Sequence, residues 1–197
     1  MNLRELIEDL PGEIKVYGDP DTQIASLCAD SRQVAAGALF FCTPGLRVDA
    51  HDFAPQAIQK GAVALIVQRK LDVSVPQVVV PDVRVAQSYI ASRFYGYPWK
   101  RMKMIGITGT KGKTTSSFLV KAILEAAGMK VGLIGTVCSM IGDETIPANL
   151  TTPDPIITQS LLHSMAEEGC DAVVMEVSAH ALAMHRLAGV TFDVGAF

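Results

Sequence analysis

Short apolar runs alternate along this chain with segments in which apolar residues recur at helical spacing, and together these patterns predict an α/β fold. Short apolar runs at 24–29, 38–42, 62–67, 78–80, 102–107, 130–136 and 171–177 are typical of strands. Between most of these runs, apolar residues recur at helical spacing, at 2–10, in the segment that ends at Lys60, and at 83–95, 114–127 and 156–168. Strands that alternate with helices predict mainly parallel sheets, in which ligands gather at the carboxyl ends of the strands.

The tetrapeptide Gly96-Tyr97-Pro98-Trp99 is the predicted boundary between two domains. Proline ends the preceding helical pattern, and the chain then resumes in a strand. We therefore expect one domain at 1–98 and a second at 99–197. The last apolar run, 192–197, has the pattern of a further strand in which the chain stops, so the second domain is expected to be incomplete.

A glycine-rich loop between the run at 102–107 and the helical pattern at 114–127 carries the clearest chemistry. Backbone N–H groups of such a loop converge on one point, and the positive end of the following helix dipole adds to them, which favours phosphate. Lys113 is placed to reach the β- and γ-phosphates of a nucleotide, and the Thr114 hydroxyl to ligate Mg²⁺. A turn that only joins strand to helix would need no Lys-Thr-Thr. The predicted nucleotide-binding residues are Gly109, Thr110, Lys111, Gly112, Lys113, Thr114 and Thr115.

Three further polar features are expected near the carboxyl ends of strands in the second domain. Glu176 closes an apolar run, where a nucleotide-binding sheet places a carboxylate for the metal; a structural ion pair is the alternative. Thr151 and Thr152 follow the second predicted strand in a polar loop, in which Thr152 or Asp154 can also cap the next helix. Arg186 has a planar guanidinium group, which can bind a carboxylate or phosphate through two hydrogen bonds.

Composition narrows the class of protein. With a formal charge of -3 and a pI near 5.8, the chain has no basic field for nucleic acid. The first ten residues lack the apolar core of a signal peptide, and no run reaches the length of a membrane span, so we expect a cytoplasmic protein without membrane insertion. The four cysteines form no Cys-x-x-Cys pair, which predicts buried free thiols. The four histidines are expected to be structural.

The glycine loop, Gly-Ile-Thr-Gly-Thr-Lys-Gly-Lys-Thr-Thr at 106–115, has Ile107 where the strict phosphate-loop pattern has glycine, and it resembles the ATP loop of the Mur ligase superfamily. Two other segments resemble the MurE-type ligases of that superfamily. One is Asp-Ser-Arg at 30–32 with the Pro-Gly, Asp and His-x-Phe pattern at 44–53; the other is Glu-Val-Ser-Ala-His-Ala-Leu at 176–182, followed by Arg186. Three positions depart from the usual family pattern: Ala50, Ala179 and Met184.

This resemblance implies an N-terminal Mur ligase α/β domain followed by a truncated, phosphate-loop-type central ATPase domain with a mainly parallel sheet. It implies an ATP- and Mg²⁺-dependent ligase of peptidoglycan biosynthesis, monomeric when complete. Such an enzyme adds the third amino acid, lysine or meso-diaminopimelate, to UDP-N-acetylmuramoyl-L-alanyl-D-glutamate through an acyl phosphate. The N-terminal domain of the family grips the uridine diphosphate end of that substrate.

The resemblance also implies roles for particular residues. Lys113 and Glu176 are expected to be catalytic, and Thr114 and Glu176 to hold the metal. The carbamylated lysine, adenine pocket and amino-acid site of the family lie beyond Phe197, so the chain by itself is expected to be inactive. The alternatives are another Mur or folylpolyglutamate-type ligase, or a non-catalytic nucleotide-binding module. The expected substrate-binding residues are Ser31, Thr151, Thr152, Ser178 and Arg186.

Overall fold

Two mainly parallel β-sheets form the framework of the protein, one in each half of the chain. The structure is a computed structural model that describes residues 1–45, 48–142 and 144–197. It separates into two compact units, Met1–Phe94 and Tyr95–Phe197. Pro98, where we predicted the division, lies inside the second unit in a short 3-10 helix, η2 (Pro98–Arg101). The predicted α/β class with mainly parallel sheets is confirmed.

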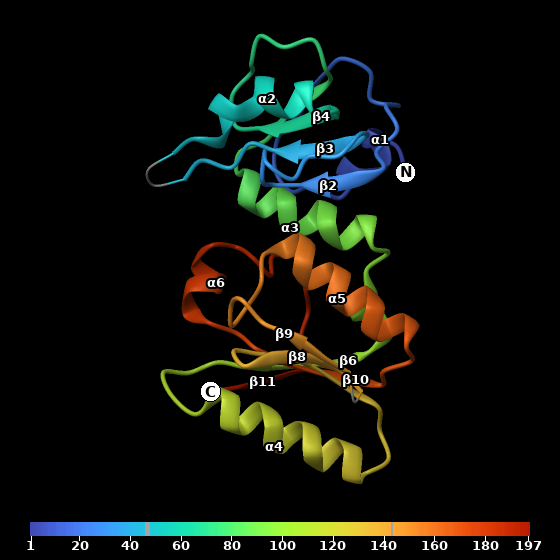
Figure 1. The fold of residues 1–197 in the computed structure, drawn as a ribbon, viewed down its shortest axis with the longest axis vertical. Helices are drawn as coiled ribbons and strands as arrows, with labels where there is room; N and C mark the ends of the chain where they lie inside the picture. The colour runs from blue at the N-terminus through green and yellow to red at the C-terminus, as the bar shows by residue number, and fades with distance from the viewer. Residues whose placement is uncertain (46–47, 143) are drawn as a thin grey trace. The chain divides into compact units, whose positions relative to one another are not determined.

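In its described residues, the first unit has a five-stranded sheet with the order β1-β5-β4-β3-β2. Its strands are β1 (Lys15–Tyr17), β2 (Ser26–Cys28), β3 (Ala38–Phe41), β4 (Ala62–Val67) and β5 (Gln77–Val79), and β1 runs antiparallel to β5. Its helices are α1 (Leu3–Ile7), η1 (Ala50–Phe53), α2 (Ala54–Gln59) and α3 (Val83–Phe94). Helices α2 and α3 cover opposite faces of this sheet (Figure 1).

The core of the first unit is built from the apolar runs that were predicted as strands. Phe40 of β3 and Leu65 of β4 are fully buried, and Ala54 and Ala57 of α2 pack against them. The apolar pattern missed β1, because all three of its residues are exposed and carry no burial signal. Its place is determined by antiparallel pairing with β5 instead.

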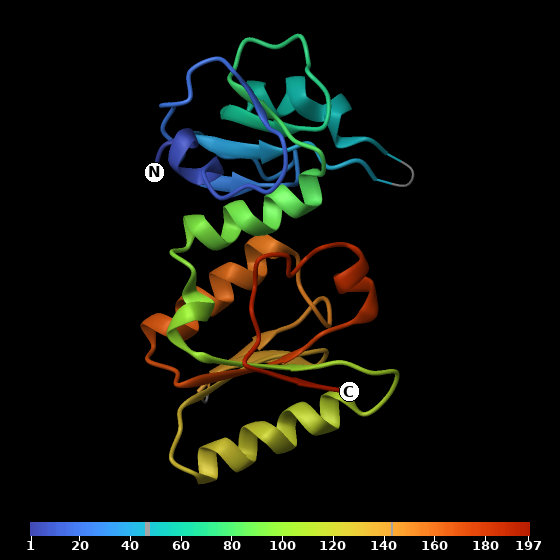
Figure 2. The ribbon, with the colours of Figure 1, turned by 180° about the vertical axis from the view of Figure 1, so that it is seen from behind.

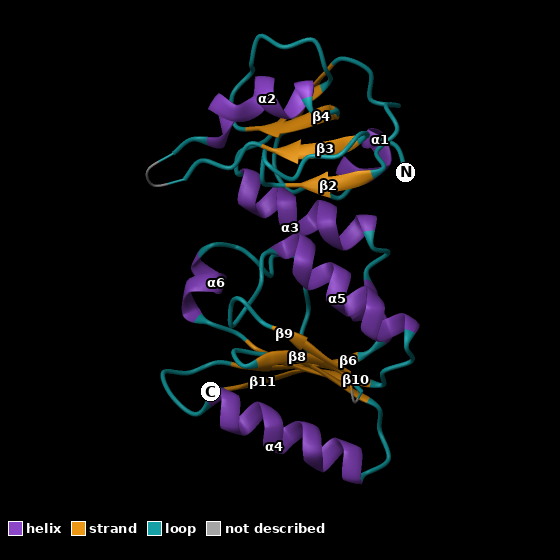
Figure 3. Cartoon of the chain, in the orientation of Figure 1, coloured by secondary structure: helices purple, strands orange, loops and turns teal. Residues whose placement is uncertain are grey.

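The described part of the second unit holds a six-stranded sheet with the order β11-β6-β10-β7-β8-β9. Its strands are β6 (Lys103–Ile107), β7 (Val131–Ile134), β8 (Cys138–Ile141), β9 (Glu144–Pro147), β10 (Ala172–Glu176) and β11 (Val194–Ala196). Its longer helices are α4 (Lys113–Ala126) and α5 (Pro155–Glu167), and a short one is α6 (Ala179–Ala183). Helices α4 and α5 lie on opposite faces of the sheet, as the view from behind in Figure 2 and the colouring of Figure 3 also show.

Successive residues of β10 point to opposite faces of the sheet, and each face has its own core. On one side, Met175 packs in a buried cluster with Leu162 of α5. On the other side, Val174 packs in a second cluster with Leu124 of α4. Burial on both faces explains why this strand reads as an uninterrupted apolar run.

In the second unit, the hairpin β8–β9, the short helix α6 and the 3-10 helix η2 were not predicted. The hairpin β8–β9 lies where we expected only a polar loop; it is antiparallel, with Ser139 opposite Ile146, and its second strand is largely exposed. The predicted substrate loop with Thr151 and Thr152 therefore follows β9. Helix α6 has five residues, too few for a helical period to be visible. No helix in the three described segments is long and apolar enough to cross a membrane.

Leu162→Ala tests the core between the sheet and α5. Leu162 is fully buried, so we expect its truncation to lower the free energy of unfolding by about 2–5 kcal/mol. The matched control is Ile157→Ala on the same helix, where the side chain is 50% exposed and a change of about 0.5 kcal/mol or less is expected. Urea denaturation of both variants measures the difference, and equal losses would contradict the assigned packing of α5.

Candidate nucleotide and metal site

The glycine loop joins β6 to α4 through backbone conformations that favour glycine. Gly109 and Gly112 have φ angles of +134° and +82°, where a residue with a Cβ is strained. Gly112 is the N-cap of α4, and the first N–H groups of a helix have no carbonyl partner within it. The Lys113 ammonium turns back and donates a hydrogen bond to the Gly109 carbonyl at 2.7 Å. Loop and lysine thus form one compact turn with unsatisfied donors, which is suited to a phosphate group.

This loop borders a cavity of about 310 Å³ at the carboxyl ends of β7 and β10. The cavity brings the loop and the first turn of α4 together with three residues from other segments. Gly109 is outside the lining and contributes through its carbonyl group. The lining residues are Thr110, Lys111, Gly112, Lys113, Thr114, Thr115, Thr136, Thr151 and Glu176.

Glu176 is the central acceptor at this cavity. It is the last residue of β10 and is fully buried beneath the lining hydroxyl groups. Its Oε1 accepts a hydrogen bond from the Thr136 N–H at 3.0 Å. Its Oε2 lies 3.0 Å from the hydroxyl of Thr114 and 3.0 Å from that of Thr136. The carboxylate therefore connects the phosphate loop to the turn that follows β7.

The alternative of a structural ion pair finds no support at Glu176. Lys, Arg and His side chains of the described residues form no ion pair with it, and its partners are neutral hydroxyl and N–H groups. A buried carboxylate with only neutral partners favours a cation nearby. Hydroxyl and carboxylate oxygens are the ligands that Mg²⁺ prefers, so Thr114 and Glu176 fit this metal. Over the described ranges, no group of three or more His, Cys, Asp or Glu side chains is placed to hold a metal ion.

The two neighbouring threonines of the 151–153 loop have different surroundings. The Thr151 hydroxyl lines the cavity and lies 3.0 Å from that of Thr136. Thr152 is buried; its hydroxyl donates to the Glu176 carbonyl at 2.9 Å and accepts the Ser178 N–H at 3.0 Å. Thr152 therefore ties two strand-end loops together. The cap of α5 is Asp154, which accepts two backbone N–H groups of the first helical turn.

Ser178 and Arg186 lie behind this loop and are not among the cavity residues. The Ser178 hydroxyl accepts the Ala181 N–H at 3.1 Å and caps α6. The Arg186 guanidinium donates to the Thr152 carbonyl at 2.7 Å. Both contacts stabilise the loops that carry the predicted substrate residues, and substrate contact by either side chain stays a prediction.

Ser31 belongs to the first unit, in the turn between β2 and β3. The Asp30 carboxylate pairs with the Arg32 guanidinium at 2.7 Å, and these hydrogen bonds lower the pKa of Asp30 to about 2. The Lys60 ammonium donates to the Ser31 carbonyl at 2.9 Å. The turn is therefore held by its neighbours, while a role of the Ser31 hydroxyl in substrate binding stays a prediction.

The second motif of the first unit, at 44–53, falls partly on residues 46–47, which lie outside the described residues. Among those described, the Asp49 carboxylate lies 2.5 Å from Nδ1 of the buried His51. The Gln68 N–H donates to His51 Nε2 at 3.0 Å. Local bonding occupies both ring nitrogens, which supports the structural role expected for this histidine.

Sequence reasoning missed Thr136 and Gly135. Thr136 contacts both oxygens of Glu176, and a Cβ on Gly135 would lie only 2.4 Å from Glu176 Oε1. The sequence does contain a signal for these two residues, because a glycine and a threonine directly follow the buried apolar run of β7. Polar residues at the carboxyl end of a parallel strand are candidates for a site.

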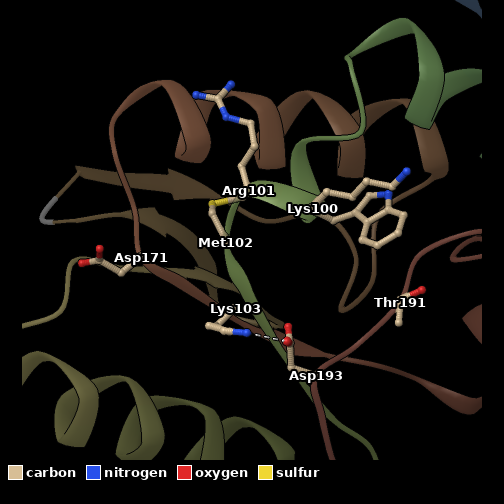
Figure 4. Close-up of a pocket in the computed structure, with 8 residues that line it drawn as sticks. Lys100, Arg101, Met102, Lys103, Asp171, Thr191 and Asp193 are labelled. Carbon is tan, nitrogen blue, oxygen red and sulfur yellow. Dashed lines mark hydrogen bonds and ion pairs between the residues drawn. The ribbon is translucent and has the colours of Figure 1, made fainter.

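A larger hollow, of about 420 Å³, lies at the amino ends of β6, β10 and β11 (Figure 4). It holds none of the predicted site residues, and its carboxylates already have partners. Asp193 accepts the Met104 N–H at 2.9 Å and pairs with the Lys103 ammonium at 3.0 Å, and these contacts lower its pKa. Asp171 accepts the Lys130 N–H at 2.8 Å. These charges support the fold and leave the smaller cavity as the candidate site.

The sequence matches two family descriptions in succession, one in each unit. "Mur ligase family, catalytic domain" matches residues 23–95, and "Mur ligase middle domain" matches residues 107–197. The chain therefore belongs to the Mur ligase family.

Relatives named UDP-N-acetylmuramoyl-L-alanyl-D-glutamate–2,6-diaminopimelate ligase occur in Geobacillus thermodenitrificans and Bacillus cereus, at 48% and 44% identity. Each alignment covers 100% of this chain and 40% of the relative. A solved structure of a ligase with this name has a TM-score of 0.82 at 27% identity, covering 99% of this chain and 39% of that one. MurF from Acinetobacter baumannii has a TM-score of 0.63 at 25% identity, with coverages of 90% and 36%. The chain spans about two fifths of the length of these relatives.

Gly135→Ala tests how closely Glu176 packs on the turn after β7. The new Cβ would lie 2.4 Å from Glu176 Oε1, so the carboxylate must move. We expect the free energy of unfolding to fall by about 1–3 kcal/mol, the usual cost of overpacking. The control is Gly195→Ala, whose Cβ meets nothing within 4 Å. Urea denaturation compares the two, and an unchanged midpoint for Gly135→Ala would show that the site is looser than described.

Proposed function

We propose that this chain is the substrate-binding and nucleotide-binding portion of an ATP- and Mg²⁺-dependent ligase of peptidoglycan biosynthesis. The proposed reaction adds an amino acid to UDP-N-acetylmuramoyl-L-alanyl-D-glutamate in the cytoplasm, and the complete enzyme is proposed to act as a monomer. Similar relatives are named for 2,6-diaminopimelate, which favours that amino acid over lysine. The first unit is proposed to grip the uridine diphosphate group and the second to bind ATP.

One observation carries the proposal: the buried Glu176 carboxylate meets the Thr114 hydroxyl beside the Lys113 loop. This places a carboxylate, a metal-binding hydroxyl and an ammonium group around one cavity at the carboxyl edge of a parallel sheet. A Mg²⁺ ion, when bound, supplies neutralisation of phosphate charge. Thr114 and Glu176 are the residues that would hold it.

The proposed chemistry assigns a separate task to each group. The loop N–H groups and Lys113 bind and orient the β- and γ-phosphates, since phosphoryl transfer depends mainly on positioning and charge stabilisation. A carboxylate oxygen of the muramoyl peptide attacks the γ-phosphorus, and ADP leaves. The amine of the incoming amino acid then attacks the acyl phosphate carbon, and inorganic phosphate leaves with formation of the amide bond.

The remaining predicted residues are proposed to serve the muramoyl peptide. Thr151 lies at the cavity, and Arg186 contacts the backbone of the adjacent Thr152. Ser178 is proposed as a further contact, and Ser31 as a contact of the uridine diphosphate end. A ligase that adds D-alanyl-D-alanine is the closest rival, but a solved structure with that name superposes with a lower TM-score, 0.61.

Calorimetric titration of the 1–197 chain tests this assignment. The probes are ADP with Mg²⁺, UDP-N-acetylmuramoyl-L-alanyl-D-glutamate, and the corresponding UDP-muramoyl tripeptide. We expect binding of the nucleotide and a preference for the dipeptide over the tripeptide. Preference for the tripeptide would indicate the rival ligase, and nucleotide binding without either peptide would indicate a binding module.

Lys113→Ala is expected to weaken binding of Mg²⁺·ADP by about tenfold or more, the scale of a lost hydrogen bond to a charged group. Loss of the ammonium removes the charge that faces the phosphates. The control is Lys100→Ala, which changes a lysine of the same unit outside the cavity. Fluorescence titration with a labelled ADP measures the affinity of both variants. Wild-type affinity in Lys113→Ala would show that the loop does not bind the nucleotide phosphates.

Arg186→Ala is expected to weaken binding of the UDP-muramoyl dipeptide by about tenfold, because a charge-assisted contact is lost. Affinity for Mg²⁺·ADP should stay near the wild-type value. Arg101→Ala is the control, since Arg101 is paired with Glu167 outside the cavity. Calorimetry with each ligand separates the two effects, and equal weakening of both ligands would show that Arg186 has been assigned to the wrong substrate.

A further inference from the structure

Thr136 contacts the Glu176 carboxylate from a hydrogen-bonded turn. It lies in the turn between β7 and β8, which is closed by a hydrogen bond from the Gly135 N–H to the Cys138 carbonyl at 3.2 Å. Gly135 lets the carboxylate approach the backbone of this turn, because a Cβ there would clash with Oε1. The Thr136 residue itself is exposed, so its contribution to core packing is small.

Donor and acceptor chemistry assigns the direction of each hydrogen bond around Glu176. An ionised carboxylate only accepts hydrogen bonds, so the hydroxyl groups of Thr114 and Thr136 both donate hydrogen bonds to Oε2. Because the Thr136 hydroxyl has only one hydrogen, which it donates to Glu176, its oxygen is the acceptor of the hydrogen bond with the Thr151 hydroxyl at 3.0 Å. The three hydroxyl groups therefore form one ordered set around the carboxylate.

This arrangement leaves the lone pairs of the Thr114 oxygen available for a cation. A ligating hydroxyl must direct its proton away from the metal, and Glu176 Oε2 is the acceptor that receives it. Thr136 holds that acceptor from the other side, through its N–H to Oε1 and its hydroxyl to Oε2. Partners of this kind, which orient metal ligands, usually change metal affinity by about 10- to 100-fold when removed.

We propose that Thr136 is a positioning residue of the metal site, which holds the Glu176 carboxylate so that Thr114 presents its lone pairs to the metal of the bound nucleotide. The proposal rests on the proposed function and deepens it. Through Thr151, the same hydroxyl set joins the metal site to a residue proposed to bind the muramoyl peptide.

The test is the Mg²⁺ dependence of ADP binding by the 1–197 chain. Dissociation constants are measured with Mg²⁺ and with EDTA, and their ratio reports the metal contribution. Thr136→Val keeps the shape but lacks the hydroxyl, and we expect its ratio to fall at least about tenfold while affinity in EDTA is unchanged. Thr136→Ser keeps the hydroxyl and should restore most of the ratio. Thr151→Val, which removes a more distant donor, should give an intermediate loss.

Each outcome decides a separate point. A wild-type chain that binds ADP without Mg²⁺ dependence overturns the proposed metal site and this inference with it. A wild-type response that Thr136→Val retains overturns the inference alone. Equal losses with Mg²⁺ and EDTA, or a serine variant as weak as valine, indicate a structural role and also overturn it. Should Thr136→Val fail to fold, as judged by circular dichroism, an unchanged ratio in Thr151→Val overturns it.

Discussion

A buried carboxylate at the end of a central strand is the constraint on which the second unit depends. Removing such a charge from water costs several kcal/mol, so its position is tolerated only when its partners are exact in geometry. Glu176 obtains these partners from the turn after β7 and from the first helical turn after the phosphate loop. The parallel register that sets Glu176 opposite Ile107, and Met175 opposite Ile134, brings these segments together. The strand register that the sheet requires is therefore also the register that assembles the site.

Some residues of the loops around this carboxylate hold the loop backbone in place, and others line the cavity. Thr152 is buried, and its hydroxyl forms hydrogen bonds with the backbone of Glu176 and Ser178, whereas the adjacent Thr151 faces the cavity. Arg186 holds the carbonyl of Thr152 in the same loop. A change at either supporting residue would therefore be transmitted through the backbone to Thr151, on the side of the cavity that is proposed to bind the muramoyl peptide. Residues near a site can affect ligand binding in this way without lining the cavity.

Elements with a strong local signal were predictable. The apolar run at 62–67 coincides with β4, and the glycine loop lies between β6 and α4 as expected. The missed elements are short or exposed: β1 and β9 have little buried apolar surface, and their pairing partners determine their positions. Such pairing is a property of two segments, so the pattern within one segment does not contain it.

The sequence alone determined the α/β class, the phosphate loop with Lys113 and Thr114, and the strand-end position of Glu176, because each depends on residues close together in the chain. The tertiary structure decided which groups meet at the carboxylate. Thr136 stands 40 residues before Glu176, and Thr114 stands 62 residues before it. It also decided that Thr151 faces the cavity while Thr152 is buried. Parallel pairing of β7 with β10 and of β10 with β6 makes these residues neighbours in space, and their separation along the sequence does not reveal that they are close.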